Sequence, residues 1–393
     1  MDICKVFRVV STVLLGCAVL GMGGAGQQTE YSWAEAAAES YWFSFYNVQT
    51  LLMASGLGLQ APQEFSERLE VEVPMMANVY LNSVPFISGD PHYLKEPDFK
   101  DAASLLWNPE KMDKSVTPQA LAFTILAATS WAKHFEHLLS AGLVSPQEAK
   151  FNGLVIGMLA AEMATFAEAN LKDQETGLYF HAWQDGAITD HSLVPADQIT
   201  MLWALSAAGY IFRLYLGVAE QAYALADALF KALLKYAENN PDWLKMTLAH
   251  HDNGLLIEAL AWYAASAHDA TLIEKAVQWL NLLARELVKK AEQMAKAGAF
   301  GLLIAQEGFS PLATQAQIVT GLLAAYSLTG NEAYKEAGLS AWQSLSGPQR
   351  LWDEEAGLFV SNPFQGAYEY KINEVGDVLG AFNAVIRIAG MED

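Results

Sequence analysis

Acidic residues recur at the points where apolar helical segments begin. Asp197 lies in PADQ, Asp252 in HHDNG and Glu374 in NEVGD, while Glu307 comes just before a fourth such segment. Paired carboxylates across a cleft are what glycoside hydrolysis needs, one as the acid and the other as nucleophile or base. Helix capping competes with this interpretation, because acids in a first turn accept hydrogen bonds from free N–H groups. We take Asp197 and Asp252 as the candidate catalytic pair, and Glu307 and Glu374 as candidate substrate-binding residues.

The stretch DQETGLYFHAWQDGAITDH, residues 173–191, gathers acids, histidines and aromatic residues in one loop. It contains His181 and His191, and His251 lies in a later loop. Histidines and carboxylates together could hold a metal ion, but neither H-x-x-E-H nor H-E-x-x-H spacing occurs. The alternative is a set of ordinary polar loop residues, in which Asp190 and His191 form one hydrogen-bonded pair. We therefore predict no metal, and we take His191, His251 and Asp190 as candidate ligand contacts.

Aromatic residues accompany these polar groups. Trp183 lies between the two histidines of the loop, and its flat ring could pack against the C–H face of a sugar. We take Trp183 as a candidate substrate-binding residue. Leu178 and Tyr179 have a different prediction: they plug the end of the helical array as part of a short hairpin.

Composition excludes several classes of protein. The formal net charge is -21, from 44 acidic and 23 basic residues, so nucleic acid is not an expected partner. The only cysteines are Cys4 and Cys17, which leaves the rest of the chain without a disulfide or a thiolate zinc site. Outside the glycine-rich GMGGAG of residues 21–26, the sequence contains no G-x-G-x-x-G, Walker A, G-x-S-x-G or C-x-x-C-H motif, and we predict no cofactor.

Residues 1–26 are typical of an export leader. Lys5 and Arg8 precede an apolar run over residues 9–22, which is shorter than the roughly 20 residues of a membrane span. Cleavage after Gly26 would release a soluble protein. LLGC, ending at Cys17, is instead similar to a lipobox and would attach the chain to a membrane through a lipid on Cys17. An uncleaved anchor is a third alternative, and each predicts a periplasmic, cell-surface or extracellular protein.

Helix signals are dense in the rest of the chain, and the predicted helices are of two kinds. Strongly apolar helices, which suit an inner layer, are expected near 118–135, 196–216, 252–267, 313–329 and 374–389. Helices with one charged face, which suit an outer layer, are expected near 145–172, 218–239, 270–297 and 331–346. A further helix at about 32–55 could pair with the last inner helix. The sequence thus predicts five or six helical hairpins.

The connections between these helices alternate in length. Turns from an inner to an outer helix are short, as at Gly217 and Gly330, whereas the return connections are long. Two long connections are similar: DQETGLY, from Asp173, matches DEEAGLF, from Asp353. Such a repeat indicates a repeated structural unit, so we predict one domain over 27–393 with an irregular insertion at 60–117. The long loops would carry short β-hairpins and lie on one face.

Alternating inner and outer helices, with D-x-x-x-G-L-F/Y in the return loops, resemble the α/α-toroid superfamily of six-hairpin glycosidases and related sugar epimerases. The resemblance covers about 115–393 and concerns the fold. It implies an all-α toroid whose long loops line a substrate funnel at the N-terminal ends of the inner helices. It also implies, as an alternative to paired carboxylates, a pair of histidines as acid and base. The adjacent-aspartate pair of some toroid mannanases is absent.

Two functions follow as hypotheses. The first is an exported glycoside hydrolase that acts on an oligo- or polysaccharide through Asp197 and Asp252. The second is a non-catalytic envelope or extracellular scaffold that binds a protein or glycan. In the second hypothesis the segment 60–109, which contains the apolar stretches VPMMANVYL and VPFI, would contact a protein partner.

Overall fold

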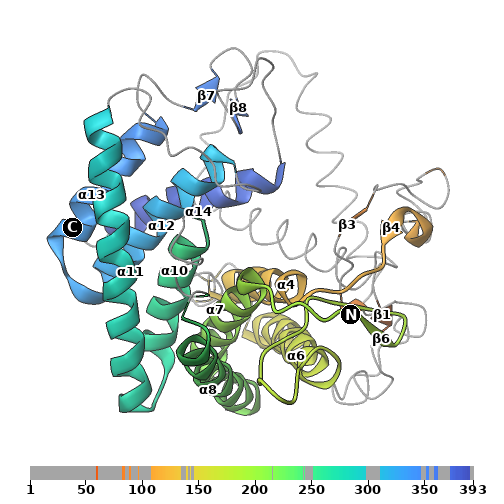
Figure 1. Cartoon of the computed structure of the whole chain (residues 1–393). Coiled ribbons are helices and arrows are strands. Elements are labelled where there is room, and N and C mark those ends of the chain that lie inside the picture. The colour runs from red at the N-terminus through yellow and green to blue at the C-terminus, as the bar shows by residue number, and fades with distance from the viewer. Residues whose placement is uncertain are drawn as a thin grey trace, which may run out of the picture. The chain divides into compact units, whose positions relative to one another are not determined.

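The computed structural model describes part of the chain (Figure 1). The described residues are 59–60, 82–84, 88–89, 96, 108–133, 139, 142, 146–214, 216–241, 243, 251–297, 310–346, 351–353, 358–361 and 372–389. The chain divides into two compact units, one of Met1–Lys114 and Lys133–Gly153 and the other of Ser115–Ala132 and Leu154–Asp393. The leader at 1–26 and the helix expected at 32–55 lie outside the described residues.

The described part of the first unit contains short antiparallel strand pairs. Strand β1 (Leu59–Gln60) pairs with β2 (Asn82–Val84), and β3 (Ser88–Gly89) pairs with β4 (Met112–Asp113). A 3-10 turn, η4 (Pro109–Lys111), precedes β4. Most of the predicted contact segment 60–109 lies outside the described residues, and the single domain over 27–393 stays a prediction.

In the second unit, the strongly apolar segments form the inner helices. These are α4 (Pro118–Lys133), α7 (Pro195–Ile211), α10 (His251–Ser266), α12 (Pro311–Thr329) and α14 (Ile372–Ala389). Helix α10 packs against α7 and α12, and α12 packs in turn against α14. Every residue of α12 from Pro311 to Ala325 is buried. A helix that is apolar on all sides must be covered on all sides, and α12 lies between α10, α13 and α14.

The segments with one charged face form the outer helices. These are α6 (Pro146–Asn170), α8 (Leu216–Asn239), α11 (Ala270–Ala297) and α13 (Glu332–Ser346). Helix α8 packs on α7, α11 on α10, and α13 on α12, and α11 and α13 lie side by side (Figure 1). Helix α11 buries a single stripe that includes Leu272, Leu280 and Leu287, which matches helical periodicity. The predicted all-α fold of inner and outer helices is confirmed.

Local signals set several helix ends. The Ser310 hydroxyl accepts a hydrogen bond from the Ala313 N–H at 3.0 Å, with proline at the next position, and so caps α12. At its other end Gly330 adopts a left-handed φ of 66°, which terminates the helix. The Thr117 hydroxyl caps α4 in the same way by accepting from the Ala120 N–H at 3.2 Å.

One predicted boundary differs. Gly217 was expected to be the turn between two helices, but α8 begins at Leu216 and therefore includes this glycine. The chain turns earlier, in the 3-10 segment η5 (Phe212–Leu214) that follows the end of α7. Phe212 is fully buried there. Burial of this aromatic ring sets the turn and outweighs the local tendency of glycine to end a helix.

The two similar loop motifs form equivalent hairpins. In the first, Lys172 bridges Tyr179 and the Asp173 N–H donates to the Leu178 carbonyl at 2.8 Å. In the second, β7 (Trp352–Asp353) pairs with β8 (Leu358–Phe359) in the same register. A further hairpin of β5 (Ala182–Gln184) and β6 (Ala187–Asp190) follows the first motif. The predicted β-hairpins in the long loops are confirmed, and the sequence repeat is also a structural repeat.

Candidate active site

The loop 173–191 is organised by its own polar residues. The Asp173 carboxylate accepts hydrogen bonds from the N–H groups of Glu175 and Thr176 and from the Thr176 hydroxyl. The bond from the Thr176 hydroxyl is the main reason that the pKa of Asp173 is lowered. Farther along, Asp185 at φ 49° and Gly186 at φ 92° form the tight turn of the β5–β6 hairpin. Hydrogen bonds within residues 173–191 therefore hold this loop in a defined conformation.

Buried contacts attach the loop 173–191 to α7. The Gln198 side chain, which is fully buried in the first part of α7, accepts from the Tyr179 N–H at 2.9 Å and donates to the Tyr179 carbonyl at 2.8 Å. The Tyr179 hydroxyl donates to Glu168 of α6. Val116, just before α4, exchanges two backbone hydrogen bonds with Trp183. Leu178 and Tyr179 are each only 1% exposed, in agreement with packing under the loop.

These attachments place His181 against Asp197, the third residue of α7. Nδ1 of His181 lies 2.7 Å from Oδ2 of Asp197, although the two residues are 16 positions apart. The other Asp197 oxygen accepts a hydrogen bond from the Gln119 N–H at 3.3 Å. Since an ionised carboxylate can only accept, the contact assigns the Nδ1 proton to the His181 ring and leaves Nε2 to accept or donate elsewhere.

Burial differs sharply between the two partners. The Asp197 side chain is 1% exposed, whereas the His181 side chain is 33% exposed. Burial raises the pKa of Asp197 to about 6, although the hydrogen bond and charge of His181 act in the opposite direction. The arrangement is that of a buried carboxylate that orients a histidine, and the histidine is the member that a ligand can reach.

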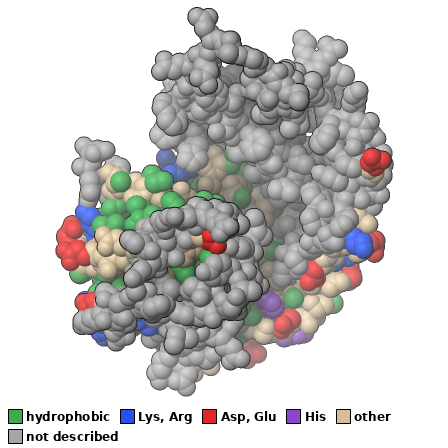
Figure 2. Space-filling view, turned by 90° about the horizontal axis from the view of Figure 1, so that it is seen from above, with side chains coloured by type: hydrophobic (Ala, Val, Ile, Leu, Met, Phe, Trp, Pro, Cys, Tyr) green, Lys and Arg blue, Asp and Glu red, His purple; other side chains and the backbone are tan. Residues whose placement is uncertain are grey.

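Asp190 and His191 lie at the edge of this pair. The Asp190 carboxylate accepts from the Ser192 N–H at 2.8 Å, which is the main reason that its pKa is lowered, and His181 and His191 lower it further. The His191 ring meets the Phe180 ring edge-on, with centroids 4.9 Å apart. Histidine and acidic side chains are visible together at one edge of the surface in Figure 2. The charges of His181 and His191 thus both act on Asp190.

The remaining candidates are placed differently. Trp183 is 9% exposed and its ring packs edge-on against Phe166 at 5.2 Å, so in this structure it serves mainly in packing. Asp252 lies in the first turn of α10. It was the predicted catalytic partner of Asp197, but the charged groups that shift the pKa of Asp197 are His181 and Asp190. Glu374 is buried in the first turn of α14. Glu307 and the side chain of His251 lie outside the described residues.

Sequence reasoning missed the pairing of Asp197 with His181. His181 was one of several loop histidines, and no spacing rule links a hairpin residue to a helix that begins 14 positions later. The available signal was the order of elements, because a hairpin that precedes a helix directly can fold back on its first turn. Glu258 was missed as well, although a single acid inside the apolar segment GLLIEALAW is conspicuous.

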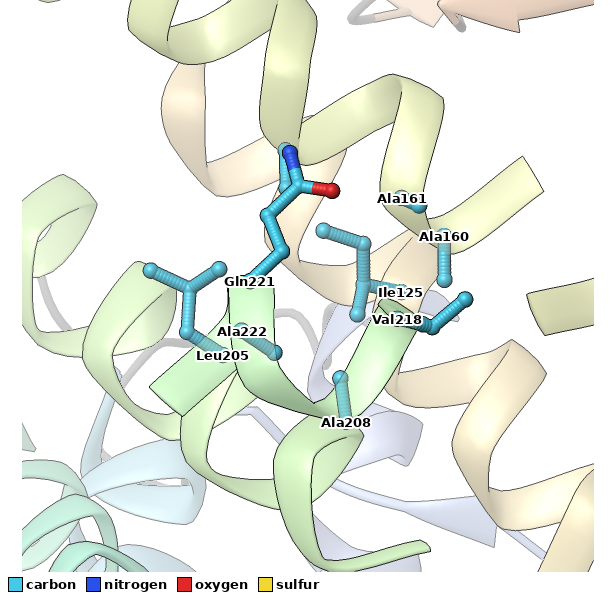
Figure 3. Close-up of a pocket in the computed structure, with 9 residues that line it drawn as sticks. Ile125, Ala160, Ala161, Leu205, Ala208, Val218, Gln221 and Ala222 are labelled. Carbon is cyan, nitrogen blue, oxygen red and sulfur yellow. The ribbon is translucent and has the colours of Figure 1, made fainter. Parts of the chain in front are cut away.

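One small cavity lies among helices of the second unit. It is lined by apolar side chains such as Ile125 of α4, Leu205 of α7 and Val218 of α8 (Figure 3). Its volume of about 10 Å³ is close to the minimum that holds one water molecule. A gap of this size and composition is a packing defect, and a sugar cannot enter it.

The described part of the chain also bears on metal binding and on membrane insertion. Within that part, no set of three or more histidine, cysteine and acidic side chains is arranged to hold a metal ion. The helices described there are also too short or too polar to cross a membrane.

No protein-family model matches the chain, and no curated protein matches its sequence. Among solved structures, a cellobiose 2-epimerase from Spirochaeta thermophila is similar with a TM-score of 0.46 and 15% identity, over 71% of this chain and 72% of that one. A D-mannose isomerase is similar with a TM-score of 0.48 and 12% identity, over 92% and 100% of the two chains. A cellobiose 2-epimerase from Bacillus thermoamylovorans has a TM-score of 0.41 at 12% identity, over 89% and 87%.

Proposed function

We propose that this protein is a carbohydrate-active enzyme in which His181 transfers a proton to or from a sugar. The single observation that carries the proposal is the 2.7 Å contact between Nδ1 of His181 and the buried carboxylate of Asp197. A carboxylate in this position fixes the tautomer and orientation of a histidine and stabilises its protonated form. Nε2 of His181 is then the atom that accepts and returns the proton.

The reaction class that fits is aldose isomerisation or epimerisation. Nε2 would remove the proton from the carbon beside the carbonyl of an open-chain sugar, which leaves an enediolate. If His181 returns the proton to the neighbouring carbon, and the hydroxyl proton passes between the two enediolate oxygens, the product is a ketose. If His181 keeps the proton and a second acid donates its own proton to the opposite face of the original carbon, the product is an epimer. We expect Asp190 and His191, which lie near His181 in the same loop, to contact the sugar hydroxyls.

Hydrolysis through Asp197 fits the geometry less well. Asp197 is 1% exposed, and each of its oxygens is occupied, one by His181 and the other by the Gln119 N–H. A general acid must reach the glycosidic oxygen within hydrogen-bonding distance. His181 meets that condition better than Asp197, and this is why we prefer proton transfer at carbon to the glycosidase predicted from the sequence.

The test is solvent exchange. The protein would be incubated in D₂O with D-glucose, D-mannose or cellobiose, and deuterium at the carbon beside the carbonyl would be followed by NMR. We expect exchange with at least one sugar, and we expect His181→Asn to reduce the exchange rate by about 100-fold or more, the usual contribution of a general base.

Because the pKa of Asp197 is about 6, the exchange rate of the unaltered protein should also fall as the pH drops through this value.

Asp185→Asn is the matched control, because it changes an exposed carboxylate in the same hairpin at a φ of 49° that asparagine tolerates. It should exchange at the rate of the unaltered protein. Equal rates for His181→Asn and the unaltered protein would refute the proposal. Release of shorter sugars from an oligosaccharide, without exchange, would instead support the glycosidase predicted from the sequence.

A further inference from the structure

A second group of polar side chains lies where α10, α12 and α14 pack together. Nη2 of Arg387 in α14 lies 4.0 Å from Oε1 of Glu258 in α10. Nε2 of Gln317 in α12 donates a hydrogen bond of 2.6 Å to Oδ1 of Asp377 in α14. The charge of Asp377 also acts on Glu258, so the four residues form one electrostatic group, named here the inner polar cluster.

Close helix packing brings these residues together. A Cβ at Gly254 would lie 2.1 Å from the Gln317 carbonyl oxygen, so α10 and α12 touch through their backbones at this point. Glu258 lies one turn after Gly254 on the same side of α10. Asp377 and Arg387 come from α14, which packs against α12.

Burial of the Glu258 carboxylate within the inner polar cluster is unfavourable for its charged form. Burial raises the pKa of Glu258 to about 7, while Arg387 lowers it and Asp377 raises it. A 4.0 Å separation is too long for a hydrogen bond, so the guanidinium and the Glu258 carboxylate do not satisfy one another fully. The buried Glu258 carboxylate pairs only partly with the partly exposed Arg387, which leaves hydrogen-bonding capacity for a further group.

Two atoms of the cluster show where that capacity lies. Gln317 is 5% exposed, and its Oε1 has no hydrogen-bond partner among the described residues. Nε of Arg387 also lacks one there. Because the Gln317 amide is planar and its Nε2 is bound to Asp377, its Oε1 is held within the cluster. The acceptor on buried Gln317 and the donor on partly exposed Arg387 are groups that a ligand with adjacent hydroxyls can satisfy.

We propose that Glu258, Gln317, Asp377 and Arg387 form a binding site for a polyhydroxylated ligand. One ligand hydroxyl donates to Oε1 of Gln317, and a neighbouring hydroxyl oxygen accepts from Nε of Arg387. The carboxylates of Glu258 and Asp377 accept from further hydroxyls. The choice of a sugar as the ligand rests on the function proposed above, whereas the site itself rests on the geometry of the cluster.

The test is calorimetric titration of the full chain with D-glucose, D-mannose and cellobiose. Arg387→Lys keeps the positive charge near Glu258 and removes the Nε donor. Gln317→Met keeps the length of the side chain and removes the acceptor. Each variant should weaken the binding of the best sugar by about tenfold or more, the loss expected for one buried or charge-assisted hydrogen bond.

Gln315→Met is the matched control. Gln315 lies two positions before Gln317 in the same helix and is equally buried, but its Nε2 donates to the Ala341 carbonyl of α13 at 2.9 Å. This variant should lose thermal stability and still bind the sugar with the affinity of the unaltered protein. A second measurement needs no variant to fold: the ¹⁵N–¹H resonance of Arg387 Nε in the unaltered protein should shift when the sugar is added.

The outcomes separate the two proposals. If folded Arg387→Lys and Gln317→Met bind every sugar like the unaltered protein, or if the Arg387 Nε resonance does not move, the inner polar cluster is not a sugar site, even where solvent exchange at His181 persists. If both variants lose binding but the unaltered protein shows no exchange, the site stands and the proposed reaction is wrong. If the unaltered protein binds none of the sugars and shows no exchange, both proposals are overturned.

Discussion

His181 and Asp197 illustrate how one contact decides the chemistry of each residue. Asp197 is buried and binds two donors, while His181 projects toward solvent from a hairpin. Neither residue alone is unusual, because loop histidines and first-turn aspartates are common. Their contact gives the histidine a defined tautomer, while burial raises the pKa of the aspartate to about 6 against the opposing effect of the histidine.

The raised pKa of Asp197 predicts a pH dependence of stability that is the reverse of the usual one for aspartate. The folded value is about 6 and the ordinary value is 3.8, so between these pH values the folded protein binds more protons than the unfolded chain. The contribution of Asp197 to the free energy of unfolding should therefore decrease as the pH rises from about 4 to 6. A shift of about 2 pKa units corresponds to roughly 3 kcal/mol.

Asp197→Asn removes this titration. The free energy of unfolding of the unaltered protein minus that of the variant, measured with urea, should fall between pH 4 and 6 and stay constant from pH 6.5 to 7.5. A difference that is constant over the whole range, or that increases with pH, would show that burial does not dominate at Asp197.

The helices α10 and α12 approach one another closely where a polar side chain is positioned. Gly254 meets the backbone of Gln317, and Gly321 of α12 in turn lies against the backbone of Gly254. Glycines on both helices let the two backbones touch, and this places Gln317 of α12 beside Gly254, one turn before Glu258 in α10. The packing of the elements and the geometry of the inner polar cluster therefore depend on the same glycines.

Gly254→Ala should separate α10 from α12. The added methyl group would lie 2.1 Å from the Gln317 carbonyl oxygen, which forces the backbones apart, so we expect the free energy of unfolding to fall by about 2 kcal/mol or more. Gly376→Ala in α14 is the control, since no atom lies within 4 Å of its Cβ position and alanine favours the helix by up to about 1 kcal/mol. Urea unfolding of both variants would test this, and equal stabilities would contradict it.

At the scale of the whole molecule, the net charge bears on what the protein contacts, and the predicted leader bears on where it is found. A net charge of -21 keeps copies of the chain apart and disfavours contact with anionic surfaces. The leader at 1–26 would carry the protein out of the cytoplasm before it meets a sugar substrate. We propose that the protein is exported, with a soluble product, a lipid-attached product or an uncleaved anchor as the alternatives.

Mass spectrometry of the full chain expressed in a bacterial host would test export. We expect a mature protein that starts at Gln27 or one that starts at a lipid-modified Cys17. Cys17→Ala separates the two, because it leaves cleavage after Gly26 intact and abolishes lipid attachment. Recovery of only the complete chain of 393 residues would mean that the leader is not removed.

The sequence by itself determined the helices and their two kinds. Helical periodicity, caps such as Ser310 and terminal glycines such as Gly330 are local signals, and local hydrogen bonds and burial decide the elements they mark. The repeat of the Asp173 and Asp353 loop motifs likewise predicted equivalent hairpins, because a turn motif of this kind folds through contacts within itself.

The tertiary structure alone decided which side chains meet. Asp197 was expected to act with Asp252, yet its oxygens contact His181 and the Gln119 N–H, the latter 78 positions away. Gln317 and Asp377 are 60 positions apart. The periodicity of the sequence does not encode such pairs, because they depend on how each helix is shifted along its axis and rotated about it relative to its neighbours. The types of residue available for chemistry can be read from the sequence, whereas their partners, burial and pKa values arise only when the helices pack.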